Sequence, residues 1–124
     1  MKIFTLHEAN LLLHDLIPKL RAIRDSYVKI DGLREPARMA ASASEAGGGM
    51  AGGSQYIRLL YNVGKLTSEL QALGVELKDH SRGLIDFPFM RKDRIAYLCW
   101  QFDDGDEIHW WHEIDGGFAG RKLL

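Results

Sequence analysis

The side chains that could do chemistry are gathered in one segment, from Glu76 to Arg121. This segment contains all three tryptophans, the only cysteine and the histidines His80, His109 and His112. Its densest run is HWWHE, residues 109–113. No motif in the segment specifies a reaction, so the sequence indicates where a site would lie without naming an activity.

Histidine and glutamate in the HWWHE run are potential metal ligands. In a strand, however, His109 and His112 project to opposite faces because their spacing is odd. The helical spacing of an H-E-x-x-H zinc site is absent as well. We therefore expect no metal or other cofactor, and if a metal bound, His112 and Glu113 would be its ligands. We expect instead a buried His112 that is hydrogen-bonded to the Tyr97 hydroxyl or to a nearby carboxylate.

Carboxylates near these histidines could act as a general acid and base if their environments separated their pKa values. The candidate catalytic residues are Asp86, His112 and Glu113, with Asp79 and Asp115 as further acidic groups. The alternative is that the carboxylates pair with arginines, which we favour because charged side chains are usually solvated or paired. The arginines available to them are Arg82, Arg94 and Arg121.

Cys99 is the only thiol that could act as a nucleophile. It stands between Leu98 and Trp100 in a predicted strand, where burial raises the pKa of a thiol and so disfavours the reactive thiolate. We expect Cys99 to be a small core residue.

Two loops in this half carry further polar groups. Residues 103–107, DDGDE, resemble part of a calcium loop but lack its distal glutamate, so we predict a turn. Residues 116–121, GGFAGR, could hold an anion through backbone amides and Arg121. We predict that this C-terminal tail folds over the sheet, with Phe118 as its anchor.

The N-terminal half must position this segment, and it reads as a helical hairpin over residues 5–74. Thr5 and Glu8 fit a capping box, which predicts a helix beginning at Leu6. Pro18 lies inside the apolar repeat of this helix and predicts a kink or a break. The periodicity lapses over residues 31–54, which predicts a flexible Gly-rich loop. A second apolar stripe then runs to Leu73, and Gly74 is suited to end its helix.

After Gly74 the apolar period changes to two, which predicts an antiparallel β-meander over residues 75–124. The expected strands are residues 75–78, 84–91, 94–102 and 107–114. Lys92-Asp93 and Asp104-Gly105 are the predicted two-residue turns. Pro88 favours an edge or bulged strand. The fold class is therefore α+β, a long two-helix antiparallel hairpin followed by a three- to four-stranded antiparallel meander in one domain, residues 1–124.

These turns would place Asp86 opposite Cys99 and Tyr97 opposite His112, and alternation then assigns the faces. One face would carry Asp86, Pro88, Ile95, Tyr97, Cys99, Ile108, Trp110, His112 and Ile114. The other would carry Phe87, Phe89, Leu98, Trp100, Phe102, His109, Trp111 and Glu113. Both faces are apolar, and one helical pair covers only one of them. We therefore expect a homo-oligomer, most simply a dimer.

Composition excludes some partners. The 124 residues carry a formal net charge of −1, with no one-signed basic field, so nucleic acid is not expected as a partner. No run approaches the length of a membrane span, and no secretory leader pattern opens the sequence. A single cysteine fits a reducing compartment. We expect a cytoplasmic protein with no membrane partner.

Five motifs resemble one bacterial family. They are FTLHEANLLL, LGVELKD, RGLIDFP, YLCW and WHEIDGGFAGR, and together they are similar to the domain of unknown function 2203. The resemblance implies a small cytoplasmic α+β protein and supplies no activity. Its recurring polar positions would fall on Glu8, Asn10, Asp79, Asp86, His112, Glu113, Asp115 and Arg121. Among these, Glu8, Asp79, Asp115 and Arg121 are the candidate ligand-binding residues. His7, His80 and His109 stand where the pattern is loose or broken, so they are poor site candidates.

The favoured function is a non-catalytic binding or assembly module that self-associates. The alternative, which leaves enzymatic activity open, is a small-ligand or metal-dependent hydrolase-like enzyme that uses Asp86, His112, Glu113 and Arg121. Convergence of these four side chains in one pocket would favour the enzyme, whereas dispersal into separate ion pairs would favour the module.

Overall fold

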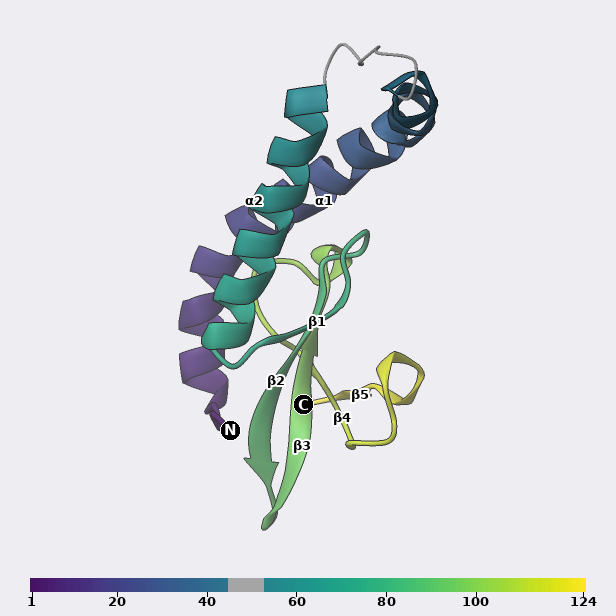
Figure 1. Ribbon diagram of the computed structural model, residues 1–124. Coiled ribbons are helices and arrows are strands. Elements are labelled where there is room, and N and C mark those ends of the chain that lie inside the picture. Colours follow the sequence, from purple (N-terminus) through teal and green to yellow (C-terminus); the bar gives the residue numbers. More distant parts are fainter. Residues whose placement is uncertain (45–52) are drawn as a thin grey trace.

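Two helices lie against one face of an antiparallel sheet in the computed structural model, which describes residues 1–44 and 53–124 (Figure 1). The helices are α1 (Leu6–Ser44) and α2 (Gly53–Ala72). The sheet has the order β1-β2-β3-β4-β5. Its strands are β1 (Glu76–Asp79), β2 (Leu84–Arg91), β3 (Arg94–Trp100), β4 (Trp110–His112) and β5 (Lys122–Leu123). The α+β class is confirmed, with one strand more than predicted.

The predicted capping box starts α1. The Glu8 amide donates to Thr5 Oγ1 at 3.0 Å, and the Thr5 amide donates to Glu8 Oε1 at 2.9 Å. Two of the four free amides at the helix start are thereby satisfied. The hydrogen bonds from Thr5 lower the pKa of Glu8. Glu8, a candidate ligand-binding residue, therefore has a structural role as a helix cap.

Helix α1 is longer than predicted. It runs without a break through Pro18 and Pro36, although its axis changes direction along its length (Figure 1). The prediction of a loop over residues 31–54 is wrong for residues 31–44 and 53–54, which are helical, and residues 45–52 lie outside the described parts of the chain. Residues 31–44 are rich in alanine and in charged helix formers, and Asp31 pairs with Arg34 across one turn at 3.2 Å.

The core lies between the helices and the inner face of the sheet, which we define as the face toward α1 and α2. Its most buried members from the helices are Leu13, Leu16, Leu20, Ile23 and Leu70. Those from the sheet are Ile85, Phe87, Ala96, Leu98, Trp100 and Trp111. Burial of this continuous apolar surface explains why α1 persists past Pro18, because packing compensates for one missing backbone hydrogen bond. Neither helix, over its described residues, is long and apolar enough to cross a bilayer.

The β2–β3 hairpin has the predicted register. Lys92 and Asp93 form the turn with φ of 48° and 67°, and two positive φ angles are what a type I′ turn requires. Asp86 therefore pairs with Cys99, and Phe87 pairs with Leu98. Alternation along these strands sends Phe87 and Leu98 to the inner face and Asp86 and Cys99 to the opposite side, which we call the outer face.

The β3–β4 pair also has the predicted register, with Tyr97 opposite His112 and Cys99 opposite Trp110. The connection was predicted wrongly, because β3 ends at Trp100 and a short 3₁₀ helix, Phe102–Asp104, replaces the two-residue turn. The Asp104 carboxylate stabilises this helix by accepting the Gln101 amide at 3.0 Å. A two-residue turn at Asp104-Gly105 would have paired Phe102 with Glu107 and Trp100 with His109, and neither pair is present among the residue pairs of β3 and β4.

The longer connection also moves Ile108. It was predicted on the face of Asp86, but it belongs to the core beneath the helices and is buried. Its amide donates to Asn10 Oδ1 on α1 at 2.8 Å. The prediction failed because a strand alternation was extended through residues that are not in a strand.

Pro88 occupies a part of β2 that β1 does not reach. β1 pairs only with Leu84, Ile85 and Asp86, so the missing amide of Pro88 leaves no gap in that ladder. The Pro88 carbonyl accepts the Phe4 amide at 2.8 Å. Pro88 is buried and β2 lies between β1 and β3, so the prediction of an edge strand is wrong; Pro88 is tolerated because β1 is too short to pair beside it.

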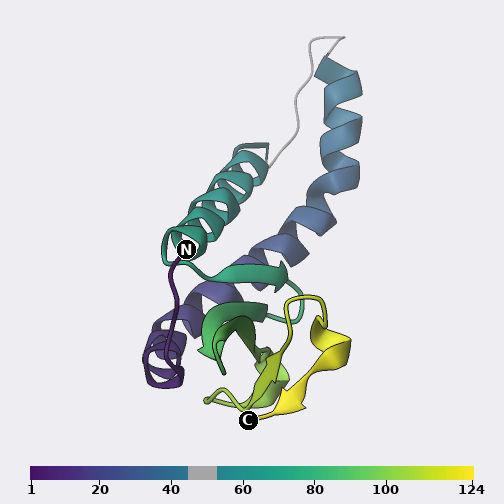
Figure 2. The ribbon, with the colours of Figure 1, turned by 90° about the horizontal axis from the view of Figure 1, so that it is seen from below.

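The C-terminal segment, residues 113–124, folds back along the outer face and adds β5 to the edge of the sheet beside β4 (Figure 1). Figure 2 shows it on the side of the sheet away from α2. Phe118 is held between the guanidinium groups of Arg82 and Arg121, at 3.9 and 4.4 Å from the ring centre. The predicted tail is confirmed, and the chain itself supplies cover for the second sheet face.

Gly74 ends α2 with a φ of 88°. The Val75 amide donates to the Leu70 carbonyl at 3.1 Å and the Gly74 amide to the Gln71 carbonyl at 3.0 Å, which is the Schellman pattern. A Cβ at residue 74 would lie 2.7 Å from Lys2 Cβ.

We predict that Gly74→Ala lowers the free energy of unfolding by about 1–2 kcal/mol, because it combines a strained φ with a steric clash. Gly64→Ala is the matched control: Gly64 is inside α2 with nothing within 4 Å of a new Cβ, so it should stabilise by about 0.5–1 kcal/mol. Urea unfolding followed by circular dichroism measures both. A Gly74→Ala protein as stable as the wild type would contradict the proposed helix end.

Candidate functional site

Three chemically distinct side chains meet at the centre of the outer face. Asp86 comes from β2, Cys99 from β3 and His112 from β4, and one potential ligand atom of each lies within 4.8 Å of the others. The two registers cause this, because Asp86 is directly opposite Cys99 and His112 is opposite Tyr97, two residues away on the same face. All three residues are buried.

The hydrogen bonds of His112 fix its ring. Nδ1 lies 2.7 Å from the carbonyl oxygen of Glu113, and Nε2 lies 3.0 Å from Asp86 Oδ2. A carbonyl only accepts, so Nδ1 carries a proton and Nε2 faces the carboxylate. The expectation that His112 bonds a nearby carboxylate is confirmed. Tyr97 contributes ring packing at 5.5 Å between centroids.

Asp86 is buried with half of its carboxylate unsatisfied. The residue is 3% exposed, and Oδ1 has no hydrogen-bond partner among residues 1–44 and 53–124. Burial raises the pKa of Asp86, and His112 opposes that rise. An unsatisfied buried polar atom of this kind costs about 1–3 kcal/mol, so it calls for a functional explanation.

Asp86 lies on the wall of a cavity of about 280 Å³ between the outer face and the C-terminal segment. The cavity is lined by Lys78, Leu84, Asp86, Tyr97, Cys99, His112, Ile114, Gly117 and Phe118. We call this cavity the outer pocket. Its walls are mostly apolar with a few polar groups, which is the usual composition of a small-molecule site.

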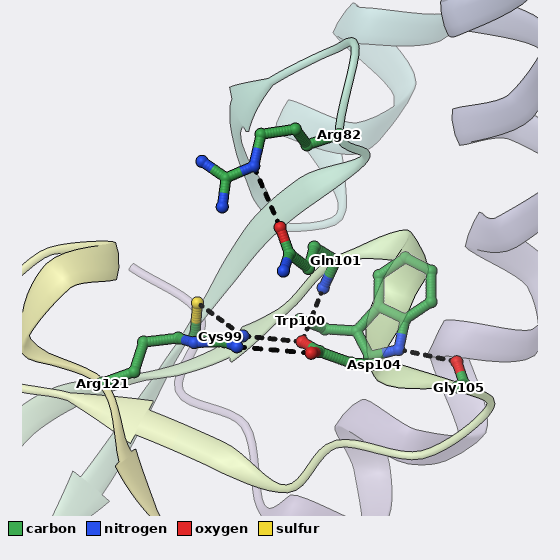
Figure 3. A network of polar contacts seen from close by, with 7 residues as sticks. All are labelled: Arg82, Cys99, Trp100, Gln101, Asp104, Gly105 and Arg121. Carbon is green, nitrogen blue, oxygen red and sulfur yellow. Dashed lines mark hydrogen bonds and ion pairs between the residues drawn. The ribbon is translucent and has the colours of Figure 1, made fainter.

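Arg121 locks the C-terminal segment beside this pocket (Figure 3). Its guanidinium forms two bonds to the Asp104 carboxylate, at 2.6 and 3.3 Å, and Nη1 is 4.0 Å from Cys99 Sγ. Both charged side chains are about nine-tenths buried. Gln101 extends the network, since its Oε1 accepts Arg82 Nε at 3.0 Å.

Cys99 is unsuited to nucleophilic chemistry in this setting. Burial and the neighbouring Asp86 raise the pKa of its thiol to about 12, with Arg121 acting in the opposite direction. The thiol is therefore protonated at neutral pH. Cys99 is buried, as predicted, but on the outer face and not in the core between the helices and the sheet.

The other candidates do not reach the outer pocket. Glu113 forms an ion pair with Arg94 beside a different cavity, which Trp111 and Lys122 also line. Asp79 accepts hydrogen bonds from Ser81 in the turn after β1, and Asp115 is exposed. Of the four residues proposed for an enzyme, only Asp86 and His112 touch each other, with Arg121 one residue removed through Cys99. The structure therefore places His112 and Glu113 in different surroundings.

Two residues of the site were not identified from the sequence. Asp104 was interpreted only as a turn residue, yet it is the partner of Arg121, seventeen positions away. Lys78 lines the outer pocket while its ammonium pairs with Glu76 at 2.9 Å. Cys99 was predicted to lie opposite Asp86 from the strand register, and this register is how the sequence places Cys99 in the site.

We predict that His112→Ala lowers the free energy of unfolding by about 3 kcal/mol, because it opens a cavity and leaves the buried Asp86 carboxyl without a partner. His109→Ala, at the exposed position directly before β4, should change the free energy of unfolding by less than about 0.5 kcal/mol. Thermal and urea unfolding of both proteins give the comparison. An unchanged melting temperature for His112→Ala would show that the pair is not structural.

The chain was compared with known proteins. The family described as an uncharacterized conserved protein, domain of unknown function 2203, matches residues 2–124. Neither the curated proteins nor the solved structures contain a match. Because the match spans nearly the whole chain, the protein belongs to the domain of unknown function 2203 family.

Proposed function

We propose that this protein binds a small molecule in the outer pocket, with Asp86 and His112 as its polar recognition groups. The observation that carries the proposal is that Asp86, whose buried Oδ1 has no hydrogen-bond partner among the described residues, is one of the residues that line an open cavity. A ligand that donates a hydrogen bond to Oδ1 would recover the cost of leaving it unsatisfied.

The lining of the pocket defines the ligand class. A cavity of about 280 Å³ suits a molecule of roughly ten non-hydrogen atoms or fewer. Leu84, Ile114 and Phe118 offer apolar contact, and Asp86 offers an acceptor at one end. A compact apolar body with an amine, amidine or amide donor satisfies both.

Binding is favoured over hydrolysis by the state of the other candidates. Glu113 is engaged by Arg94, and Arg121 is engaged by Asp104. Neither group is available to activate water or to stabilise a developing oxyanion in the outer pocket. The hydrolase-like alternative therefore has the weaker support.

A larger cavity of about 390 Å³ lies between the end of α2 and β1. Its lining includes the exposed residues Met1, Lys2 and Gln71, and none of its side-chain atoms among the described residues is buried without a hydrogen-bond partner. Size alone does not make a ligand site, so we favour the smaller outer pocket.

A fragment screen by protein-observed NMR tests the proposal, using small amines, amidines and amides on apolar rings. Binding fragments should shift the amide signals of Asp86, Cys99 and His112, and Asp86→Ala should abolish these shifts. Asp79→Asn is the matched control, since its carboxylate serves only a surface turn. Hits that gather at the larger cavity instead, or an absence of saturable hits, would refute the outer pocket as a ligand site.

Self-association is a second candidate, now supported by the helices rather than by the sheet. Helix α2 packs inward through Val63 and Leu70, and a separate apolar stripe on another side of the helix, Ile57, Leu60 and Tyr61, is exposed. Ile57 and Tyr61 are 68% and 70% exposed and belong to the first half of α2, and Figure 1 shows this end of α2 projecting beyond the sheet. A second copy presenting the same stripe would cover it in a symmetric dimer.

Light scattering on purified protein at micromolar concentration should report a dimer. The double variant Ile57→Glu, Tyr61→Glu should be monomeric, because charges on the stripe oppose its burial. Met90→Glu is the control: Met90 is an exposed apolar residue near the β2–β3 turn, away from the stripe. A monomeric wild type would exclude this interface.

We also propose a cytoplasmic location. Its support is the single cysteine, which is free and buried, as is usual in a reducing compartment.

A further inference from the structure

We infer that Asp86, Cys99 and His112 form a three-ligand site for a thiophilic divalent cation, best suited to Zn²⁺, at the base of the outer pocket. The inference deepens the proposed function, because the cation would be the anchor for a ligand entering the pocket. It does not depend on that function, since a cation site can exist without a second ligand.

The three ligand atoms have the chemistry and the spacing that zinc uses. Imidazole nitrogen, thiolate sulfur and carboxylate oxygen are all common zinc ligands, and the sulfur disfavours Mg²⁺ and Ca²⁺. With bonds of about 2.0–2.3 Å, tetrahedral ligand atoms lie about 3.3–3.8 Å apart. Here Nε2 and Oδ2 are 3.0 Å apart, and all three atoms lie within 4.8 Å of one another. Side-chain movements on the order of 1 Å would bring ligand atoms within 4.8 Å of one another to that spacing.

Two observations independent of this clustering point to a ligand. The Nδ1–H group of His112 is held by the Glu113 carbonyl at 2.7 Å, an outer contact that orients metal-binding histidines and leaves Nε2 to face the ligand. Asp86 lines the pocket, and its Oδ1 is buried and lacks a hydrogen-bond partner among the described residues. A cation would engage the carboxylate that protein groups leave half satisfied.

Charge balance supports a dication at this place. A carboxylate and a thiolate neutralise Zn²⁺, so the loaded site carries no net charge into a buried region. The nearby cations are already paired, Arg121 with Asp104 and Lys78 with Glu76, so they add little repulsion. As the zinc–sulfur bond forms, the Cys99 thiol proton passes to solvent, and Arg121 near Sγ favours the resulting thiolate.

The fourth position would face the pocket. Three protein ligands with one open position are the arrangement of zinc sites that hold a water molecule or an exchangeable ligand, whereas structural sites use four protein ligands. The outer pocket lies against all three residues, so the open position would be reached from it. The ligand class is then a small molecule with a nitrogen, oxygen or sulfur donor.

Metal titration of the full-length, chelator-treated protein tests the inference. Calorimetry with Zn²⁺ should show one site per chain, and Co²⁺ should give a near-ultraviolet thiolate charge-transfer band with visible bands of tetrahedral cobalt. Cys99→Ser should remove the charge-transfer band. His112→Gln should weaken Zn²⁺ binding at least about 100-fold, because losing a residue that only hydrogen-bonds to a metal ligand already costs up to about 100-fold and His112 is proposed as a direct ligand. His109→Gln, at an exposed position, should bind as the wild type does.

The outcomes separate folding, metal and ligand. Circular dichroism establishes that each variant is folded, and if one is not, the cobalt spectrum of the wild type decides alone: without a thiolate charge-transfer band the inference is overturned. Zn²⁺ binding that survives unchanged in both Cys99→Ser and His112→Gln also overturns it. Fragments that bind the metal-free pocket while cobalt gives no such band would leave the proposed function standing without the metal. A cobalt–thiolate band with no fragment binding would support the metal site and contradict the proposed binding of a small molecule.

Discussion

The register of β2 against β3 is the constraint on which the rest of the molecule depends. Seven residue pairs run without interruption from the turn at Lys92 and Asp93, so every side chain on both strands is committed to one face. The same alternation that sends Phe87 and Leu98 into the core sends Asp86 and Cys99 to the outer face. A slip by one residue would place a carboxyl group beneath the helices and expose a phenylalanine. The core thus stabilises the geometry of the candidate site.

The outer face shows how a small chain covers both sides of one sheet. The helices bury the inner face, and the C-terminal segment returns across the outer face, where Arg121 and Asp104 hold it through a nearly buried ion pair. Such a pair is costly to form, because both charges leave water, and costly to break, because either partner alone would stay buried. It secures the segment in one position and leaves the outer pocket beside it. The C-terminal segment that covers the outer face therefore also forms one wall of the outer pocket.

Within that pocket, Asp86 and His112 are placed by strands, and strands hold side chains more firmly than loops do. Both Nδ1 and Nε2 of His112 are engaged, whereas one Asp86 oxygen is not. The site is therefore rigid and buried, and what it lacks is a partner for Asp86 Oδ1 among the described residues. Ligand binding and cation binding are two ways of completing it, and both begin at the same oxygen.

Local sequence pattern determined much of this protein. The capping box at Thr5 and Glu8, the helix end at Gly74, the turn at Lys92-Asp93 and the pairing of Asp86 with Cys99 follow from interactions between residues close in the chain or from the two-residue period of strands. Tertiary structure decided the rest. Helix α1 continues past Pro18 because it is packed against the sheet. Ile108 turns inward because its amide is hydrogen-bonded to Asn10 on α1. Arg121 forms an ion pair with Asp104, seventeen residues earlier in the chain. These outcomes depend on packing and on burial of charge between distant segments, and periodicity carries no information about either.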